Sequence, residues 1–234
     1  MRSVKSKRKV NHVSLVFTIL LFLFALSAVL LTSPGKPLGK NIAPDEFSAE
    51  RAFEHIRSFA QNPHMVGSAN HDSVCSYIVN QLETLGVEVD VQTTTAIYNE
   101  GFPLFGNITN VVGRIRGEDN SKAILVVGHY DSQPFTPGAA DDGIAVGSML
   151  EAAGVLLKSA KLKNDVIFLF SDAEEVGLLG AKAFADEHPW AKEVGLVLNL
   201  EARGNTGVVL AFEVSPQNGW IIKEFIKGLS LIHI

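Results

Sequence analysis

The first hydrophobic segment of the chain is a run of nineteen uncharged residues, Val13 to Leu31. At about 1.5 Å rise per residue, a helix of this length reaches roughly 28 Å, close to the ~30 Å hydrocarbon core of a bilayer. A cleaved signal peptide is the alternative, but its apolar region is typically about 7–15 residues long. The segment also ends, from Leu30 to Pro34, without a small-x-small cleavage site. We therefore expect residues 13–31 to form a transmembrane helix.

Beyond this segment, apolar residues recur first at helical spacing and then in short runs. Three prolines and two glycines lie in residues 32–44, which predicts a linker. Helical spacing from Phe47 to Ala60 and from Val74 to Leu85 predicts two helices, and Gly86 is expected to end the second. The remaining pattern predicts strands over 87–97, 108–116, 123–129, 165–171, 195–201 and 207–213, and helices over 142–160, over 177–187 and from 217.

Two of the expected strands are unbroken apolar runs, Ala123 to Val127 and Val166 to Phe170. Such runs are typical of strands that are covered on both faces. Because strands alternate with helices along the chain, the pattern predicts an α/β fold with a helix-flanked, partly parallel sheet.

Composition and charge narrow the function classes. The 234 residues are 47% hydrophobic and 19% charged, which excludes a disordered chain, and the single cysteine, Cys75, excludes a disulfide scaffold. Residues 1–40 hold seven of the 20 Lys and Arg and no acid, so the remainder carries a net charge of −12. An acidic body argues against a nucleic-acid partner and favours cation binding.

The basic residues between Arg2 and Lys9 precede the apolar segment. By the positive-inside rule, residues 1–12 form a cytoplasmic tail. Everything after residue 32 is then expected to lie outside the cytoplasm.

Polar residues that can bind a metal occur in four groups: three lie at the ends of expected strands, and one opens the helix that follows the first of these strands. Ligands gather at the carboxyl ends of strands in open α/β sheets, so these residues are expected to share one site. Crowded carboxylates repel one another unless a cation lies among them, and one imidazole with several carboxylates suits Zn²⁺ or a comparable divalent ion. Each feature alone also fits an ordinary loop or a helix N-terminus. The residues are His129 and Asp131, Asp141 and Asp142, Glu174 and Glu175, and Glu201.

In combination these residues resemble the co-catalytic zinc aminopeptidases of metallopeptidase clan MH, family twenty-eight. The likeness is greatest to the membrane-anchored branch with the endoplasmic-reticulum and fungal vacuolar metallopeptidases, and it runs from about Glu50 to about Lys227. It implies a three-layer α/β/α sandwich with a mixed, mostly parallel sheet. The strings that carry it are Pro63-His64-x-x-Gly67-Ser68, His129-x-Asp131-Ser132, Ala140-Asp141-Asp142-Gly143, Glu174-Glu175-x-Gly177-x-x-Gly180 and Asn199-Leu200-Glu201-Ala202.

The resemblance also implies a role for each residue. Glu174 would be the general base, and Asp131 would orient the ring of His129. A cis peptide bond between Asp141 and Asp142 is implied as well. The implied ligands of two zinc ions are His129 and Glu201 for the first, Glu175 for the second and Asp141 between both.

One implied ligand is missing. Relatives supply a second histidine to the second zinc from a loop far downstream, whereas the only histidine after Lys227 is His233, beside the terminus. We therefore expect residues 45–229 to be a C-terminally truncated peptidase domain, residues 230–234 to be a tail of doubtful origin, and the chain to be the N-terminal part of a longer protein with further spans.

Three functions remain open at this point. A membrane-anchored zinc aminopeptidase acting on peptide substrates is favoured, because all the other implied ligands are present. The alternatives on the same fold are a non-catalytic binding ectodomain and a single-zinc glutaminyl cyclase-like enzyme. The sequence makes no prediction of oligomeric state.

Overall fold

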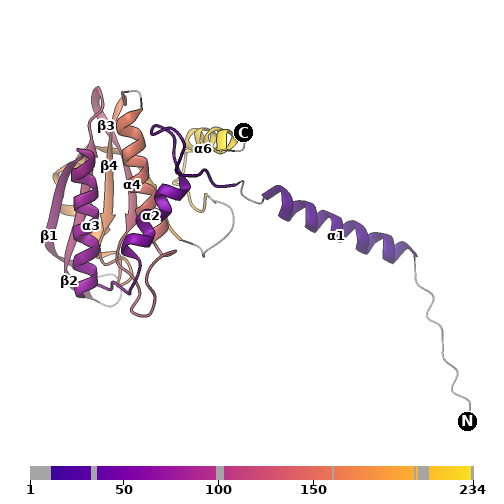
Figure 1. Ribbon diagram of the computed structural model, residues 1–234, viewed down its shortest axis with the longest axis horizontal. Helices are drawn as coiled ribbons and strands as arrows, with labels where there is room; N and C mark the ends of the chain where they lie inside the picture. The colour runs from indigo at the N-terminus through magenta and orange to yellow at the C-terminus, as the bar shows by residue number, and fades with distance from the viewer. Residues whose placement is uncertain are drawn as a thin grey trace, which may run out of the picture. The chain divides into compact units, whose positions relative to one another are not determined.

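The computed structural model describes residues 12–32, 36–98, 103–159, 161–202, 204 and 211–232 (Figure 1). Within them the chain folds into helices and strands that alternate as expected. The helices are α1 (His12–Thr32), α2 (Ala49–Phe59), α3 (Ala69–Leu85), α4 (Gly143–Lys158), α5 (Leu179–Glu187) and α6 (Gly219–Ile232), with a short 3-10 helix η1 (Pro189–Glu193); the strands are β1 (Glu88–Tyr98), β2 (Leu104–Ile115), β3 (Asp119–His129), β4 (Asn164–Ser171) and β5 (Val194–Asn199).

Serine side chains fix the starts of the two helices that precede the sheet. The hydroxyl of Ser48 accepts a hydrogen bond from the amide of Arg51 at 3.1 Å, and that of Ser68 accepts one from His71 at 3.2 Å. These caps satisfy amide groups that a helix leaves unpaired in its first turn. Gly86 ends α3 at φ +82°, a conformation that favours glycine, so the predicted end of this helix is confirmed.

The five strands form one mixed sheet in the order β1-β2-β4-β3-β5. Strand β2 is antiparallel to both β1 and β4, whereas β3 is parallel to both β4 and β5. Strands β1, β3, β4 and β5 therefore run in one direction, and only β2 runs against them. Because β3, β4 and β5 are parallel neighbours, the loops that follow them leave from the same edge of the sheet.

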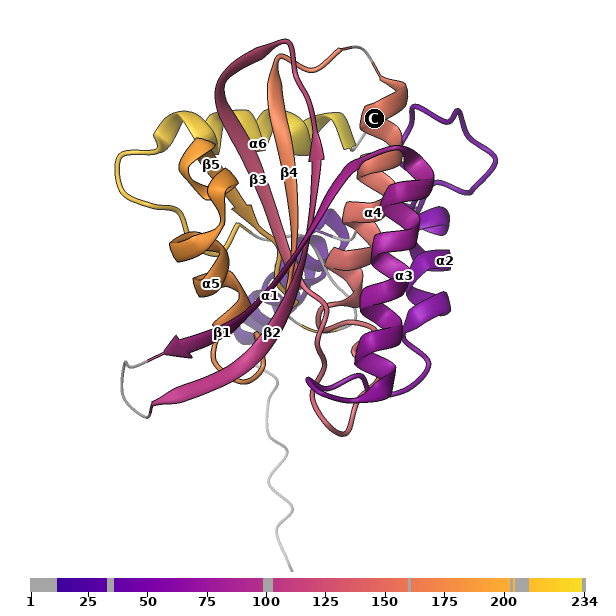
Figure 2. The ribbon, with the colours of Figure 1, turned by 90° about the vertical axis from the view of Figure 1, so that its left-hand side faces the viewer.

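Helices cover both faces of the sheet, which confirms the three-layer α/β/α arrangement. Helices α2, α3 and α4 pack on one face and α5 packs on the other (Figure 2). Strand β4 shows how one strand serves both layers: Phe168 and Phe170 belong to the core under α3 and α4, and Ile167 and Leu169 belong to the core that includes Phe184 of α5. All four β4 side chains are buried, as the unbroken apolar run predicts.

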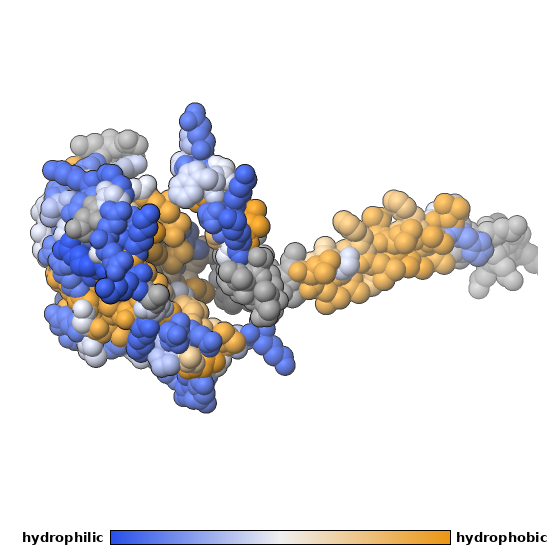
Figure 3. Space-filling model, turned by 90° about the horizontal axis from the view of Figure 1, so that it is seen from above, coloured by the Kyte–Doolittle hydropathy of each residue, from blue (hydrophilic) through white to orange (hydrophobic). Residues whose placement is uncertain are grey.

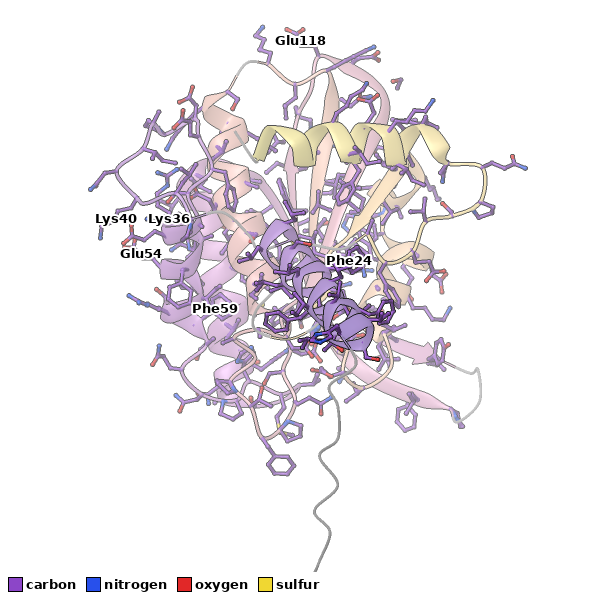
Figure 4. The ribbon with its side chains drawn as sticks, turned by 90° about the vertical axis from the view of Figure 1, so that its right-hand side faces the viewer. Phe24, Lys36, Lys40, Glu54, Phe59 and Glu118 are labelled. Carbon is purple, nitrogen blue, oxygen red and sulfur yellow. The ribbon has the colours of Figure 1, made fainter. Side chains whose placement is uncertain are left out.

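Part of the predicted linker packs on α2. The ammonium of Lys40 forms an ion pair with Glu54 at 3.1 Å, and its backbone amide donates to Glu50 at 2.8 Å (Figure 4). The guanidinium of Arg51 donates to the carbonyl of Lys40 at 3.2 Å. A compact unit accordingly extends from Pro37 to Asn205.

Helix α1 is long and apolar enough to cross a membrane. Its described side chains are exposed, and its surface is hydrophobic along almost its whole length (Figure 3). The helix contains all of residues 13–31, the predicted membrane segment.

Several boundaries differ from expectation, and the largest shifts are early starts: α3 begins at Ala69 rather than at Val74, and β3 begins at Asp119 rather than at 123. Strand β2 starts at Leu104 rather than at 108, because its first residues pair with the end of β1, from Tyr98 opposite Leu104 to Thr95 opposite Asn107. The strand expected over 207–213 falls largely outside the described residues, and residues 211–213 have no regular structure.

Candidate metal centre

The predicted metal-binding residues converge at the carboxyl edge of the parallel strands. His129 ends β3, Asp141 lies two residues before α4, Glu174 and Glu175 lie in the loop after β4, and Glu201 lies two residues after the end of β5. Two groups of three residues bring potential ligand atoms within 4.8 Å of one another: His129 with Asp141 and Glu201, and His129 with Glu174 and Glu175.

His129 is the centre of both groups. Its ring is 2% exposed, and Nε2 lies 3.1 Å from Asp141 Oδ1, 3.8 Å from Glu174 Oε2 and 4.0 Å from Glu201 Oε1. One ring nitrogen thus faces three carboxylates from three different loops. These three acids are partly or largely exposed, so the cluster opens to solvent on the side away from His129.

Asp131, in the loop after β3, connects this loop to the loop after β4. Its carboxylate is fully buried and accepts hydrogen bonds from the backbone amides of Glu174 at 3.0 Å and Glu175 at 3.1 Å. Asp131 Oδ1 also lies 3.4 Å from Nδ1 of His129, whose Nδ1 is 3.1 Å from the Asp131 carbonyl oxygen. A single side chain therefore aligns the imidazole with the paired glutamates, as expected for a group that supports a metal ligand.

The loop after β4 presents its two glutamates through an irregular backbone. Ala173 has φ +56°, a conformation that is uncommon for a residue with a side chain. The loop closes on itself where the Leu179 amide donates to the Ala173 carbonyl at 3.1 Å and the Leu178 amide donates to the Glu174 carbonyl at 3.0 Å. These bonds hold Glu174 and Glu175 at the edge of the sheet.

The loop before α4 contains a cis peptide bond between Asp141 and Asp142, as the family resemblance implies. Its two carboxylates differ in exposure. The Asp141 side chain is 54% exposed beside His129, whereas Asp142 is buried and accepts from the His129 amide at 3.4 Å. Burial raises the pKa of Asp142 to about 8, against the opposing effect of His129.

The electrostatics of the cluster indicate an excess of negative charge. Burial alone would lower the pKa of His129, but its hydrogen bond to Asp131 and the charges of Asp142 and Glu174 raise it to about 10. Burial raises the pKa of Glu174 and also that of Glu175, and neighbouring carboxylates raise both further. A field that holds a proton on an imidazole also favours a divalent cation in its place.

One ligand atom lacks a partner. Glu175 Oε1 is buried and has no hydrogen-bond partner among the described residues, while its other oxygen accepts a hydrogen bond from the side chain of Gln133. An unpaired buried carboxylate oxygen costs free energy unless a cation or a donor satisfies it. Together with the crowding around His129, this orphan oxygen fits a metal ion bound by these residues.

Some contributors to the site are not visible in the sequence pattern. Gln133 contacts Glu175, yet it is a single exposed amide in a loop and carries no spacing signal. His64 is buried and fixes the loop after β3: its amide donates to the Ser132 hydroxyl at 2.8 Å, and its carbonyl accepts from the Ser132 amide at 3.3 Å. His233 lies outside the described residues.

A mixed sheet with an imidazole and several carboxylates at the ends of its parallel strands is typical of α/β proteins that bind a metal ion there. Residues 110–233, more than half of the chain, match the family described as Peptidase family M28. The chain belongs to this family of zinc-dependent peptidases.

Two relatives share about a third of the aligned residues. Endoplasmic reticulum metallopeptidase 1 of Homo sapiens is 34% identical over 200 residues, which are 79% of this chain and 22% of that protein. The vacuolar membrane protease of Candida albicans is 34% identical over 179 residues, which are 75% of this chain and 21% of that protein. The chain thus spans less than a quarter of the length of these two relatives.

Solved structures share the fold at lower identity. Porphyromonas gingivalis glutaminyl cyclase superposes with a TM-score of 0.58 at 24% identity, covering 67% of this chain and 59% of that one. A Zn-dependent exopeptidase from Parabacteroides distasonis gives 0.58 at 22% identity, covering 68% and 63%.

Proposed function

We propose that the chain is the metal-binding part of a membrane-anchored zinc aminopeptidase, which hydrolyses the N-terminal bond of peptides. The observation that carries this proposal is the convergence of three carboxylates on Nε2 of His129, above a buried Asp131 that aligns them. Family membership supports a peptidase, and the names of the relatives support a membrane enzyme.

We assign His129 and Glu201 to a first zinc ion, Glu175 to a second and Asp141 to both. The charge of Asp141 is among the groups that raise the pKa of Glu175, which supports a position for Asp141 between the two parts of the site. When bound, two such ions polarise a scissile carbonyl and lower the pKa of a water molecule.

Glu174 is the general base of the proposed reaction. Its carboxylate is partly exposed and lies 3.8 Å from Nε2 of His129, and burial raises its pKa above the ordinary value, which suits a group that takes a proton from water. It takes a proton from the attacking water and passes it to the leaving amine. Asp131 does not contact substrate: it holds Glu174 and Glu175 through their amides and the His129 ring through Nδ1.

The same proposal places the protein in a membrane. Helix α1 is the anchor, with the basic residues before it in the cytoplasm and the acidic domain on the other side. Relatives named for the endoplasmic reticulum and for the vacuolar membrane support an internal membrane, with the peptidase domain facing the lumen.

An assay of product chemistry on the complete protein tests this function. The purified protein should release the first amino acid from a free peptide but not from its N-acetylated form. A chelator should abolish this release, and added Zn²⁺ should restore it. Conversion of an N-terminal glutamine to its cyclised form without loss of a residue would instead support the glutaminyl cyclase-like alternative. Zinc binding without either product would support a non-catalytic ectodomain.

A further inference from the structure

His71, in the first turn of α3, is buried against both loops of the metal centre. Its side chain is 5% exposed, and Nε2 lies 2.7 Å from Asp172 Oδ1. Its ring stacks on Tyr130, with the ring centroids 4.9 Å apart and the planes at 22°. Tyr130 directly follows His129 in the chain, and Asp172 lies two residues before Glu174. The imidazole therefore touches the base of both loops without reaching the acidic cluster.

Asp172 is held through all of its polar groups. Its second carboxylate oxygen accepts from the Thr109 amide at 2.7 Å, and its own amide donates to the Asn110 side chain at 3.0 Å. Its carbonyl accepts from the Gly180 amide at 2.9 Å. With His71, these bonds tie the loop that carries the glutamates to α3, β2 and α5.

The charges of His71 and Asp172 strengthen the hydrogen bond between them. Burial alone would lower the pKa of His71, but the hydrogen bond to Asp172 and the charge of that carboxylate raise it above its ordinary value. The pair is thus a charge-assisted hydrogen bond in a buried setting, which is stronger than a neutral one. Within the part of the chain that the structure describes, Nδ1 of His71 is buried without a hydrogen bond, and Asp72 Oδ1 lies 3.7 Å from it.

Packing alone does not require these residue types. Val74, Ile78 and Leu82 already bury α3 against the sheet, and a phenylalanine could stack on Tyr130 in place of His71. A buried ion pair often contributes no more stability than well-packed apolar residues of the same volume. A buried charged pair at this position therefore calls for a reason other than stability.

We propose that His71 and Asp172 are a positioning pair that fixes the orientation of the loop bearing Glu174 and Glu175. Asp172 is part of this loop and fixes it through its hydrogen bonds to His71 and to β2. The ring of His71 also stacks on Tyr130, which lies between His129 and Asp131 in the chain. The inference rests on the proposed function, in which Glu174 must lie within reach of the reacting water. The His71–Asp172 pair positions the loop and does not contact peptide, so we expect it to affect the rate of the chemical step rather than the affinity for peptide.

The chain contains a geometrically similar pair for control, whose acid, Asp90, is 53% exposed whereas Asp172 is 1% exposed. His188 is also buried, lies 3.1 Å from Asp90, and stacks on Phe184 with the same 4.9 Å separation and 22° angle. This pair joins the end of α5 to the start of β1. Because β1 runs in the same direction as β3 and β4, the control pair lies toward the opposite edge of the sheet from the metal centre.

The experiment compares His71→Phe with His188→Phe, and Asp172→Asn with Asp90→Asn, in the complete protein. The asparagine variants keep the shape if a phenylalanine variant fails to fold. The measurements are zinc content, kcat, KM and the hydrogen exchange of residues 172–180. The His71 and Asp172 variants should keep their zinc and an unchanged KM, lose between about 10-fold and 100-fold in kcat, and exchange faster across this loop. The control variants should show neither change.

Equal kcat and equal loop exchange in the two sets would overturn the positioning role. Faster loop exchange with unchanged kcat would also overturn it, because the pair would then serve only folding. If the unsubstituted protein hydrolyses no peptide, the proposed function fails. In that case the loop exchange still decides whether His71 and Asp172 hold this loop.

Discussion

Glu174 and Glu175 are adjacent in the chain, yet their carboxylates meet different neighbours. Glu174 Oε2 faces Nε2 of His129 at 3.8 Å, whereas one oxygen of Glu175 accepts from Gln133 and the other is buried without a donor. Both backbone amides bind the same Asp131 carboxylate. One anchor thus directs two like side chains to two different positions, which suits one base and one metal ligand.

Substitution of each glutamate should separate these roles. Glu174→Gln keeps the shape but cannot accept a proton, so the complete enzyme should keep its zinc and lose about 10²–10⁴-fold in kcat. Glu175→Gln replaces an anionic ligand with a neutral amide and should lower the occupancy of the second zinc. Metal analysis beside a peptidase assay measures both effects. Equal zinc loss in the two variants, or near-normal turnover in Glu174→Gln, would show that the roles are assigned wrongly.

The sequence predicts those residues of the candidate site that come shortly after a hydrophobic strand. His129 and the glutamate pair lie within a few residues after apolar runs, and strand ends in a parallel sheet meet at one edge, so the sequence predicts their convergence. Gln133 and His71 could not be found in this way. Gln133 contacts Glu175 across a loop, and His71 reaches Asp172 from 101 positions away, through packing that no local pattern encodes.

At the scale of elements, a buried charge network links β2, β4 and η1. Arg114 of β2 is 3% exposed and donates to Asp165 of β4 and to Glu193 of η1. Asp165 also accepts from the Gly117 amide at 2.7 Å. Despite its burial, these partners lower the pKa of Asp165, and Arg114 lowers that of Glu193. The network fastens the antiparallel β2–β4 pair where the sheet changes strand direction.

This network should make stability depend on pH. A carboxyl group whose pKa is lower in the folded state stabilises the fold above its ordinary pKa, and that contribution is lost as pH falls through the folded value. Arg114→Met should therefore cost about 3–5 kcal/mol at pH 7, and clearly less well below pH 4, because the contribution is lost as pH falls from the ordinary carboxyl pKa through the lower pKa of folded Asp165. Thermal or urea unfolding at both pH values measures the difference.

Lys182→Met offers the matched control for that prediction. Lys182 pairs with Asp186 at 2.6 Å on the surface of α5, with both side chains at least 40% exposed. Such i,i+4 pairs contribute only about 0.3–0.5 kcal/mol. An Arg114→Met cost that is as small as this, or one that is the same at both pH values, would contradict the proposed contribution of the network.

The elements themselves were predictable to different degrees. Strand β4 is apolar from Val166 to Phe170 because both of its faces are covered, and this leaves a clear signal in the sequence. The first part of β2 leaves none: Gly106 and Asn107 are poor strand formers, and they are extended because they pair with Ala96 and Thr95 of β1. Strand pairing is a tertiary contact, so the boundary could not be read locally.

At the scale of the whole molecule, the exposed apolar surface of α1 and the charged residues belong to separate parts of the chain. Helix α1 exposes its apolar side chains along its length (Figure 3), whereas the unit from Pro37 to Asn205 packs apolar cores on both faces of its sheet. An exposed apolar helix of 21 residues has no favourable place in water, and its length matches a bilayer. We propose that the basic residues before it and the acidic residues after it lie on opposite sides of that bilayer.

Cysteine labelling should reveal this topology in sealed vesicles that have their cytoplasmic face outward. In a Cys75→Ser background, an impermeant thiol reagent should label Lys5→Cys at once and Lys161→Cys only after the vesicles are permeabilised. Lys161 suits this test because its side chain is 84% exposed. The physical reason is the retention of Lys and Arg clusters on the cytoplasmic side during insertion. Immediate labelling of Lys161→Cys would reverse the orientation, and a Lys5→Cys label found only on a short cleaved peptide would identify residues 13–31 as a signal sequence.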